Sequence, residues 1–324
     1  MRTEDKKIVL IGGGSGNAAM LRGLKHHTSN ITVIVSVMDD GGSSGRIRDS
    51  LDMIPPGDLR NCLVALAADD NEMASIMARR FDDGTIRNES LGNLLFVALY
   101  ELTGDYLKTI ETISYVLNVR GRVLPITTNT SRISGVLKNG NEVFGESHIA
   151  EEAVREGTSI DHIRLFPDDA PLLPQCRAAI READIIIYSP GSLYTSLIPN
   201  LLVTELVDEL EASPAERIFI ANAMSEHGET DGFTVSGLIE AVEKHTGGRK
   251  IIDTVIYNTA SVPEEILSRY AAEEAAPVGN AFTPEHIQRY RFIGSDVISL
   301  DGGIVRHDAD RIWDILDKLE KENI

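Results

Sequence analysis

Residues 8–24 read IVLIGGGSGNAAMLRGL, in which a short apolar run, a cluster of glycines and a helical pattern follow one another directly. The apolar run from Lys7 to Ile11 predicts a strand, and the apolar spacing from Asn17 to Lys25 predicts a helix. A second apolar run at 31–37 predicts the next strand. Because such continuous apolar strands are buried on both faces, they are typical of a parallel sheet covered by helices. We therefore expect an α/β, Rossmann-like fold with a mostly parallel sheet and helices on both faces.

Two additions to this sheet are expected within a single domain, 1–324. Helical periodicity predicts a helical insert over 60–120. Alternating apolar residues on either side of Asn139-Gly140 predict a β-hairpin flap over 130–146, because these two residues supply the positive φ angles that a tight turn needs.

Beyond Pro174 the alternation of strands and helices returns. Helices are expected near 197–210, 235–244 and 308–321, and the apolar strands between them end in polar loops. Ligands of open α/β sheets bind beyond the carboxyl ends of the strands. These loops are therefore where a functional site should lie.

The composition indicates a folded protein and excludes some classes of partner. Fifty acidic and 31 basic side chains give a formal net charge of -19, which repels a polyanion, so no nucleic-acid partner is expected. No apolar run approaches the roughly 18 residues of a membrane span, so no transmembrane segment is expected. Cys62 and Cys176 lie in apolar patterns without disulfide or metal spacing, which favours a reducing, cytoplasmic location.

The glycine cluster predicts a phosphate-binding turn, because backbone N–H groups at a helix start bind anions. Gly14-x-Gly16-x-x-Ala19 fits the dinucleotide fingerprint, and Asp39 and Asp40 follow at about the 20-residue spacing of a ribose-binding acid. A tight turn without a ligand is the alternative. No Lys-Ser/Thr pair follows the glycines, so a P-loop NTPase is not indicated. The candidate phosphate contacts are Gly12, Gly13, Gly14, Ser15, Gly16 and Asn17.

A second polar segment, at residues 38–61, reads MDDGGSSGRIRDSLDMIPPGDLRN. It combines carboxylates, hydroxyls, glycines and arginines, and Arg46 or Arg60 could pair with a phosphate. Asp39 and Asp40 could hold Mg²⁺ together with a diphosphate, with Asp40 as the metal candidate. A solvated acidic loop with structural salt bridges is the alternative. The candidate residues are Asp39, Asp40, Ser43, Ser44, Arg46, Asp58 and Arg60.

A third segment, IIIYSPGSLYTSLIPNL at residues 185–201, predicts a second anion cradle at Ser189, Gly191 and Ser192. Helix capping by Thr195 or Ser196 explains part of this run without a ligand. The segment lacks the Gly-x-Ser-x-Gly elbow, so a serine hydrolase is not indicated.

Two further loops supply candidates. In IANAMSEHGETDG, residues 220–232, Asn222 could contact a ligand, and His227 is either a general base or a solvated surface residue. In GGIVRHDADRIW, residues 302–313, Arg306 could reach a phosphate, and Asp308 predicts the cap of the last helix.

Seven motifs in order resemble the YvcK branch of the CofD-like family, the UPF0052 gluconeogenesis factors, over nearly the whole chain: GGGSGNAAMLRGL, VMDDGGSSGRIR, PPGDLRN, SLGNLL, SPGSLYTSLIPNL, NAMSEHGETDG and IVRHD. The resemblance implies a UDP-sugar ligand such as UDP-N-acetylglucosamine. It also implies a regulatory role in cell shape and peptidoglycan synthesis on gluconeogenic carbon sources, without an established reaction. Arg306 becomes the candidate that recognises the UDP-sugar phosphate.

The same resemblance leaves other functions open. CofD transfers 2-phospho-L-lactate from a nucleotide-activated donor to a deazaflavin, so a Mg²⁺-dependent transferase of this type is the alternative, with its catalytic residues unassigned. An NAD-linked dehydrogenase rests on the glycine fingerprint alone. The expected partners are cell-wall synthesis proteins and further copies of the chain in a homo-oligomer.

Overall fold

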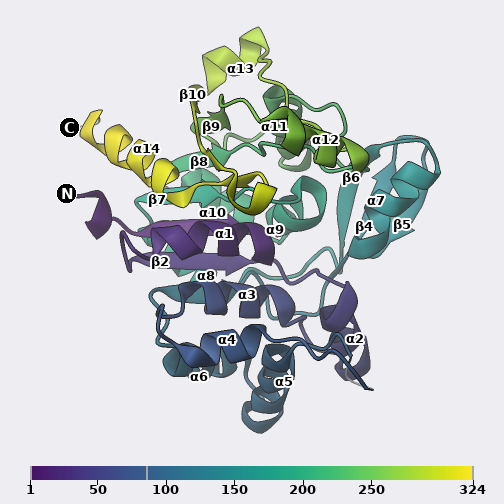
Figure 1. Cartoon of the computed structure of the whole chain (residues 1–324), viewed down its shortest axis with the longest axis vertical. Helices are drawn as coiled ribbons and strands as arrows, with labels where there is room; N and C mark the ends of the chain where they lie inside the picture. Colours follow the sequence, from purple (N-terminus) through teal and green to yellow (C-terminus); the bar gives the residue numbers. More distant parts are fainter. Residues whose placement is uncertain (1, 85–86, 323–324) are drawn as a thin grey trace.

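A computed structural model describes residues 2–84 and 87–322. Within these residues the core is a seven-stranded sheet of order β10-β9-β8-β7-β1-β2-β3, in which every neighbouring pair is parallel. The fold is thus α/β and Rossmann-like, as predicted (Figure 1). The strands are β1 (Ile8–Gly12), β2 (Ile31–Val35), β3 (Arg122–Pro125), β7 (Ile185–Tyr188), β8 (Glu216–Ile220), β9 (Thr254–Asn258) and β10 (Arg291–Ser295).

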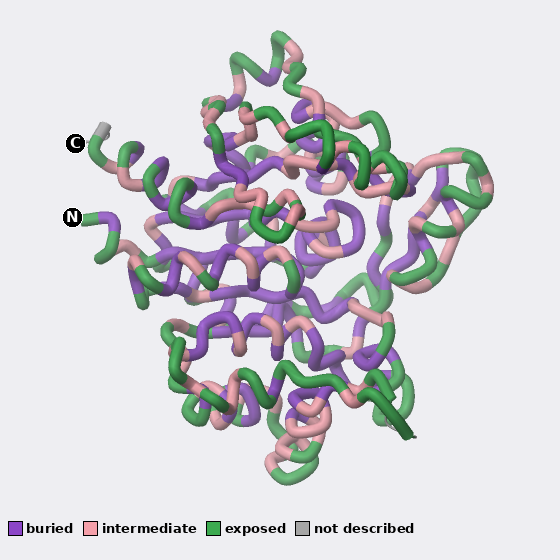
Figure 2. Tube along the Cα trace, viewed as in Figure 1, coloured by how far each residue is buried: buried purple, intermediate pink, exposed green. Residues whose placement is uncertain are grey.

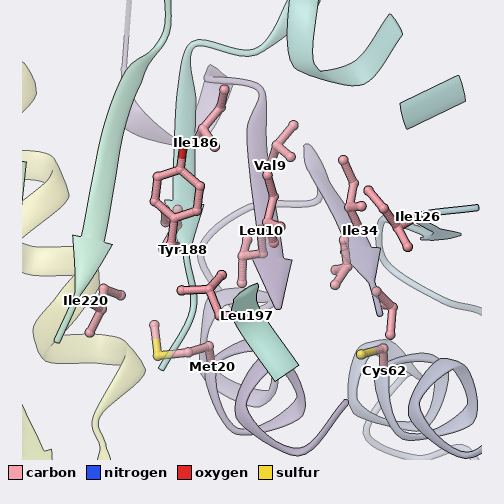
Figure 3. Close-up of a cluster of buried hydrophobic side chains, with 14 of the residues drawn as sticks. Val9, Leu10, Met20, Ile34, Cys62, Ile126, Ile186, Tyr188, Leu197 and Ile220 are labelled. Atoms are coloured by element: carbon pink, nitrogen blue, oxygen red, sulfur yellow. The ribbon is translucent and has the colours of Figure 1, made fainter. Parts of the chain in front are cut away.

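The middle of this sheet is the hydrophobic core. Every residue of β1 and β7 is buried, which explains why their sequences are apolar without alternation. Buried segments run along the central strands (Figure 2). Figure 3 shows Leu10 of β1 between the side chains of the neighbouring strands, with Met20 and Cys62 contributed by helices.

Helices pack around the sheet. Those of the first half are α1 (Gly14–Leu24), α2 (Gly42–Leu51), α3 (Gly57–Leu66), α4 (Glu72–Ala78), α5 (Leu91–Thr103), α6 (Tyr106–Leu117) and α7 (Glu146–Arg155). Those of the second half are α8 (Pro174–Glu182), α9 (Ile198–Leu201), α10 (Leu206–Ala212), α11 (Val235–His245), α12 (Glu264–Ala272), α13 (Pro284–Arg289) and α14 (Ala309–Glu322). Short turns are η1 (Thr3–Asp5), the π-helical η2 (Leu193–Leu197) and η3 (Asp301–Gly303), and β11 (Ile298–Ser299) pairs with β12 (Arg306–His307).

The helical periodicity of residues 60–120 corresponds to α3–α6. Of these helices, α3 packs on α1, and both α3 and α6 contact β3, whereas α4 and α5 pack on the other helices of the segment (Figure 1). Within the described residues no helix combines the length and the apolar character that a membrane span needs. Cys62 and Cys176 are free thiols, and both are buried.

The flap is an antiparallel sheet of order β5-β4-β6, made of β4 (Arg132–Leu137), β5 (Glu142–Phe144) and β6 (Ile160–Phe166). The predicted hairpin is confirmed as β4 and β5, but the pattern did not predict β6 or the helix α7 that packs on β4. Gly140 alone adopts a positive φ, 93°, and its N–H donates to the Leu137 carbonyl. The turn therefore has three residues rather than two, and the expected positive φ of Asn139 was wrong.

The helix expected near 197–210 is interrupted, so that prediction was wrong. The chain forms η2 and α9, leaves the helix at residues 202–205, and resumes as α10. The Thr204 N–H donates to the Ala170 carbonyl, which draws this stretch out of helical geometry, and Glu205 takes a φ of 68° before α10 begins.

Candidate functional site

The carboxyl ends of β1, β2 and β7 border a cavity of about 460 Å³, which we call the strand-end cavity. It brings together residues from four of the predicted segments, since Glu226 of residues 220–232 also lines it. The predicted residues that line it are Gly13, Gly14, Ser15, Gly16, Asp39, Ser43, Ser44, Asp58, Arg60, Gly191 and Ser192.

The first wall of the cavity is the N-terminus of α1. Its N-cap is Gly13, which has no side chain that could accept a hydrogen bond from the first N–H groups of the helix. Gly16 allows the Ser189–Ser192 loop to approach, because a Cβ at this position would lie 1.8 Å from the Pro190 carbonyl oxygen. The two loops that sequence analysis treated as separate anion cradles are thus in direct contact.

The second wall is α2, which lies in the segment for which a solvated acidic loop was the alternative. Residues 42–51 form a helix although they include two glycines and three serines, which have low helix propensity. Burial of one face compensates: Ile47 and Arg48 are buried, and the Arg48 guanidinium donates to the carbonyls of Met38, Asp39 and Ser131. The segment after β2 therefore presents a helix N-terminus to the cavity.

A third helix N-terminus, that of α3, completes the arrangement. Gly14, Gly42 and Gly57, the first residues of α1, α2 and α3, all line the cavity. The three N-cap residues, Gly13, Gly41 and Pro56, have no side chain that caps the helix. Asp58 already accepts a hydrogen bond from the Gly14 N–H at the start of α1. Because each helix start carries a partial positive charge and N–H groups without a partner inside the helix, three of them around one cavity favour an anionic ligand.

Arg60 adds a full positive charge. It is buried, its Nη2 donates to the Asn61 Oδ1 at 2.6 Å, and its Nη1 has no hydrogen-bond partner within the protein. Burial lowers the pKa of Arg60 to about 10, so the side chain stays charged at neutral pH. Arg80 also lines the cavity, but its isolated position at the end of a helical run gave no sequence signal. A buried guanidinium with a free donor is the arrangement that binds phosphate or carboxylate.

Four carboxylates line the same cavity: Asp39, Asp58, Glu146 and Glu226. Burial, together with the neighbouring Asp39, raises the pKa of Asp58 to about 7, and the same two causes raise the pKa of Glu146 to about 7. Burial also raises the pKa of Asp39. Glu146 comes from the flap, so sequence reasoning, which had no reason to place the flap against this loop, missed it. The cavity therefore mixes anion-binding groups with acids that a cation would stabilise.

Asp40 and Arg46 do not line this cavity. The Asp40 carboxylate accepts hydrogen bonds from the N–H groups of Glu146 and Ser147, both at 2.9 Å, and so caps α7 of the flap. Arg46 forms an ion pair with Glu89 on the outside of α2.

Gly12, Asn17 and Ser189 lie together beneath the cavity. A Cβ at Gly12 would be 3.4 Å from both the Asn17 Oδ1 and the Ser189 Cβ. All three residues are buried, and the polar side-chain atoms of Asn17 and Ser189 have no hydrogen-bond partner within the protein. These three residues do not line the cavity themselves; they pack beneath the turns that do.

The loop after β7 is held by two glutamates that follow β8. Ser192 Oγ donates to Glu226, and Glu229 accepts from the Tyr194 N–H and the Thr195 Oγ1. Burial, with Glu226 as the next cause, raises the pKa of Glu229 to about 8. Thr195 and Ser196 lie within η2 rather than at a helix cap, and both line the strand-end cavity.

Asn222 and Arg306 line a second cavity of about 360 Å³, which we call the β8 cavity. It adjoins the first, because Ser15, Gly16, Gly191 and Glu226 line both.

His227 lies away from both cavities, in ion pairs with Asp231 and Glu274. Asp308 accepts hydrogen bonds from the N–H groups of Asp310 and Arg311, which confirms it as the cap of α14.

Comparison with known proteins identifies similar chains. Residues 8–298 match the family model described as 2-phospho-L-lactate transferase CofD. The gluconeogenesis factor of Bacillus subtilis is 39% identical and the alignment covers 98% of each chain, and that of Listeria monocytogenes is 38% identical over 98% of this chain and 96% of the relative. The crystal structure of a UPF0052 family member from Bacillus halodurans has a TM-score of 0.91 at 38% identity, covering 96% of this chain and 98% of the other.

Proposed function

Since this chain belongs to the CofD family, and within it to the gluconeogenesis factors, we propose that it is a regulatory protein that binds a nucleotide sugar of the UDP-N-acetylglucosamine type in the strand-end cavity. The observation that carries the proposal is the convergence of three helix N-termini on one cavity that also holds Arg60. A diphosphate is the part of a nucleotide sugar that such a cavity would bind.

Mg²⁺ fits the same cavity as a bridge between carboxylates and a diphosphate. Mg²⁺ commonly takes one or two carboxylates and completes its coordination with phosphate oxygens and water. Asp39 and Asp58 would hold it, rather than the predicted Asp40, because both line the cavity and Asp40 is bonded to the flap. Bound there, the ion would offset the repulsion between these acids and the phosphates.

Thermal unfolding with added ligands tests this proposal. A ligand at 100 times its Kd adds about 2.7 kcal/mol to the free energy of unfolding. We expect UDP-N-acetylglucosamine to raise the unfolding midpoint, more so with Mg²⁺ than with EDTA, and NAD to leave it unchanged. No rise with any uridine nucleotide would contradict the proposal.

The match to the CofD model favours a second candidate, a phospholactate-type transferase with a nucleotide-activated donor. It would use the same phosphate contacts and would need an acceptor beside them. The same unfolding experiment separates the two functions: a midpoint raised by GDP with Mg²⁺ but not by UDP-N-acetylglucosamine would support the transferase.

The cellular part of the proposal follows from the relatives named gluconeogenesis factors. We propose that the protein acts in the cytoplasm, as a homo-oligomer, and passes the state of the UDP-sugar pool to cell-wall synthesis proteins in support of cell shape. Its two buried free thiols agree with a reducing compartment. Deletion of the gene should impair cell shape on gluconeogenic carbon sources and leave growth on sugars unaffected, and normal shape on both would contradict this role.

A further inference from the structure

The strand-end cavity is suited to the charged part of a nucleotide. Its walls are helix N-termini, and Arg60 and Arg80 line it as well. On the β2 side, where a dinucleotide fold usually binds the ribose, Asp40 is bonded to the flap through both carboxylate oxygens, and Asp39 accepts the Gly41 N–H at 2.9 Å. Asp40 is thus held by the flap, and Asp39 faces the proposed Mg²⁺ and diphosphate, so the uncharged part of the ligand needs another place.

The β8 cavity offers that place. It opens from the strand-end cavity across the shared backbone of Gly16 and Gly191. Among the described residues, Glu226 is the one charged side chain that lines both cavities. A carboxylate at this junction repels phosphate and accepts hydrogen bonds from hydroxyl groups, so it separates a charged part of the ligand from a neutral part.

Two neighbours of Glu226 in the β8 cavity are also hydrogen-bond acceptors. The His307 Nε2 lies 3.1 Å from the Ala221 carbonyl oxygen, which can only accept, so Nε2 carries the proton. Desolvation lowers the pKa of His307 to about 4, so the ring is neutral and its Nδ1 is an acceptor. The Asn222 Nδ2 donates to the Gly191 carbonyl at 2.8 Å, which leaves the Asn222 Oδ1 to accept. Glu226, His307 and Asn222 thus give the β8 cavity three hydrogen-bond acceptors, beside the guanidinium of Arg306.

We propose that a hydroxyl-bearing ring of the bound nucleotide, either its ribose or its attached sugar, lies in the β8 cavity with its hydroxyl groups bonded to Glu226. The neutral part of the ligand then extends toward β8, whereas a ribose bound to an acid after β2 would extend to the other side of the strand-end cavity. This inference rests on the proposed function, since it takes a nucleotide diphosphate as the ligand.

Calorimetric titration of Glu226→Gln tests the assignment. Four probes are titrated into the wild type and the variant with Mg²⁺: UDP, 2′-deoxy-UDP, UDP-N-acetylglucosamine and inorganic pyrophosphate. Loss of a charge-assisted hydrogen bond should raise the Kd of the ligand that places a hydroxyl there by about ten-fold or more. The Kd of pyrophosphate should stay the same or fall, because a nearby negative charge has been removed.

The four probes also identify the ring. If the wild type prefers UDP over 2′-deoxy-UDP and the variant loses that preference, the ring is the ribose. If the variant loses only the extra affinity for UDP-N-acetylglucosamine over UDP, the ring is the attached sugar. Equal Kd values in variant and wild type for all four probes, or a loss that includes pyrophosphate, would overturn the inference.

Two controls keep the result interpretable. Glu111→Gln, an exposed glutamate of α6, should bind all four probes like the wild type. The unfolding midpoint without added ligand reports whether Glu226→Gln folds. If the variant does not fold, the wild-type Kd values for the four probes still show whether the protein distinguishes ligands by a hydroxyl group. If the wild type binds neither UDP nor UDP-N-acetylglucosamine, it is the proposed function that fails.

Discussion

Arg60 differs from the other arginines of the predicted segments in what surrounds it. The side chain is buried and its Nη1 is unpaired, whereas Arg46 is paired with Glu89 and Arg48 is bonded to three carbonyls. Sequence analysis named Arg46 and Arg60 as equal candidates, because the spacing of polar residues does not show which one turns inward from its helix. Only the packing of α2 and α3 separates them.

We predict that Arg60→Met weakens diphosphate binding. The substitution keeps most of the buried volume and removes the donor, and hydrogen bonds to charged groups contribute about 1.5–3 kcal/mol, so the Kd of UDP should rise by roughly 10- to 100-fold. Calorimetry measures the Kd. Arg79→Met, which removes an exposed ion pair with Asp82, serves as the matched control. An unchanged Kd for Arg60→Met would exclude this guanidinium as a phosphate contact.

Asp58 and Glu146 should give nucleotide binding a pH dependence whose sign depends on Mg²⁺. Both carboxyls have a pKa of about 7, and a bound anion raises those values further, so UDP binding in EDTA takes up protons. The affinity should then rise as the pH falls from about 8 to about 6, by up to roughly ten-fold per pH unit and proton.

With Mg²⁺ the sign reverses, because the cation lowers the pKa of both carboxyls and binding releases protons. Titrations in two buffers of different ionisation enthalpy measure the proton balance directly. The same sign with EDTA and with Mg²⁺ would show that the ion does not bind beside these acids.

At the scale of elements, the flap and the loop after β2 are joined through one carboxylate. Asp40 follows β2 and caps α7, and α7 begins with Glu146, which lines the strand-end cavity. The pattern around Asn139-Gly140 predicts the hairpin from local geometry alone. It contains nothing about the partner of α7, because that contact joins residues more than a hundred positions apart.

We expect Asp40→Asn to loosen the flap rather than to remove a metal ligand. The variant retains one acceptor and loses the charge, so the α7 cap should weaken by about 1 kcal/mol. Hydrogen exchange at the Glu146 and Ser147 amides measures this change. Asp49→Asn, which breaks an exposed ion pair with Arg132, should have a smaller effect. If Asp40→Asn instead abolished the Mg²⁺ dependence of binding, Asp40 would be the metal ligand that the sequence suggested.

The order of the strands in the whole molecule explains which parts of the site the sequence could predict. The loops after β1, β2 and β7 meet because these three strands are neighbours, although β7 lies more than 150 residues away along the chain. Glycine clusters after apolar runs identify each loop locally. That α2 is a helix, and that Glu146 and Arg80 reach the same cavity, depends on packing that no local pattern contains.

The site is also tied to the C-terminal part of the fold through α1. A Cβ on Gly23 of α1 would lie 2.4 Å from the Cβ of Ala309, the first residue of α14, and α14 directly follows the strand that carries Arg306. Close contact of these two helices therefore positions one wall of the β8 cavity.

Gly23→Ala should lower the free energy of unfolding by roughly 1–3 kcal/mol, because the overpacking outweighs the better helix propensity of alanine. Urea denaturation measures the change. In Gly237→Ala the new Cβ meets only ordinary contacts, 3.4 Å from the Phe233 ring, so this control should be neutral or slightly stabilising. Equal stability of the two variants would show that α14 can shift away from α1.

The convergence of α1, α2 and α3 has a consequence for genetics. Peptide N–H groups survive every side-chain exchange except one to proline, so alanine at the exposed Ser15, in the first turn of α1, should leave the main-chain donors in place and be tolerated. Loss-of-function screens should recover bulky replacements at Gly16, where the Pro190 carbonyl leaves no room. Proline scanning of the first helical turns, a position that tolerates proline, would remove the donors one at a time. The path of the main chain, more than the identity of the exposed side chains, therefore determines the donors at this part of the site.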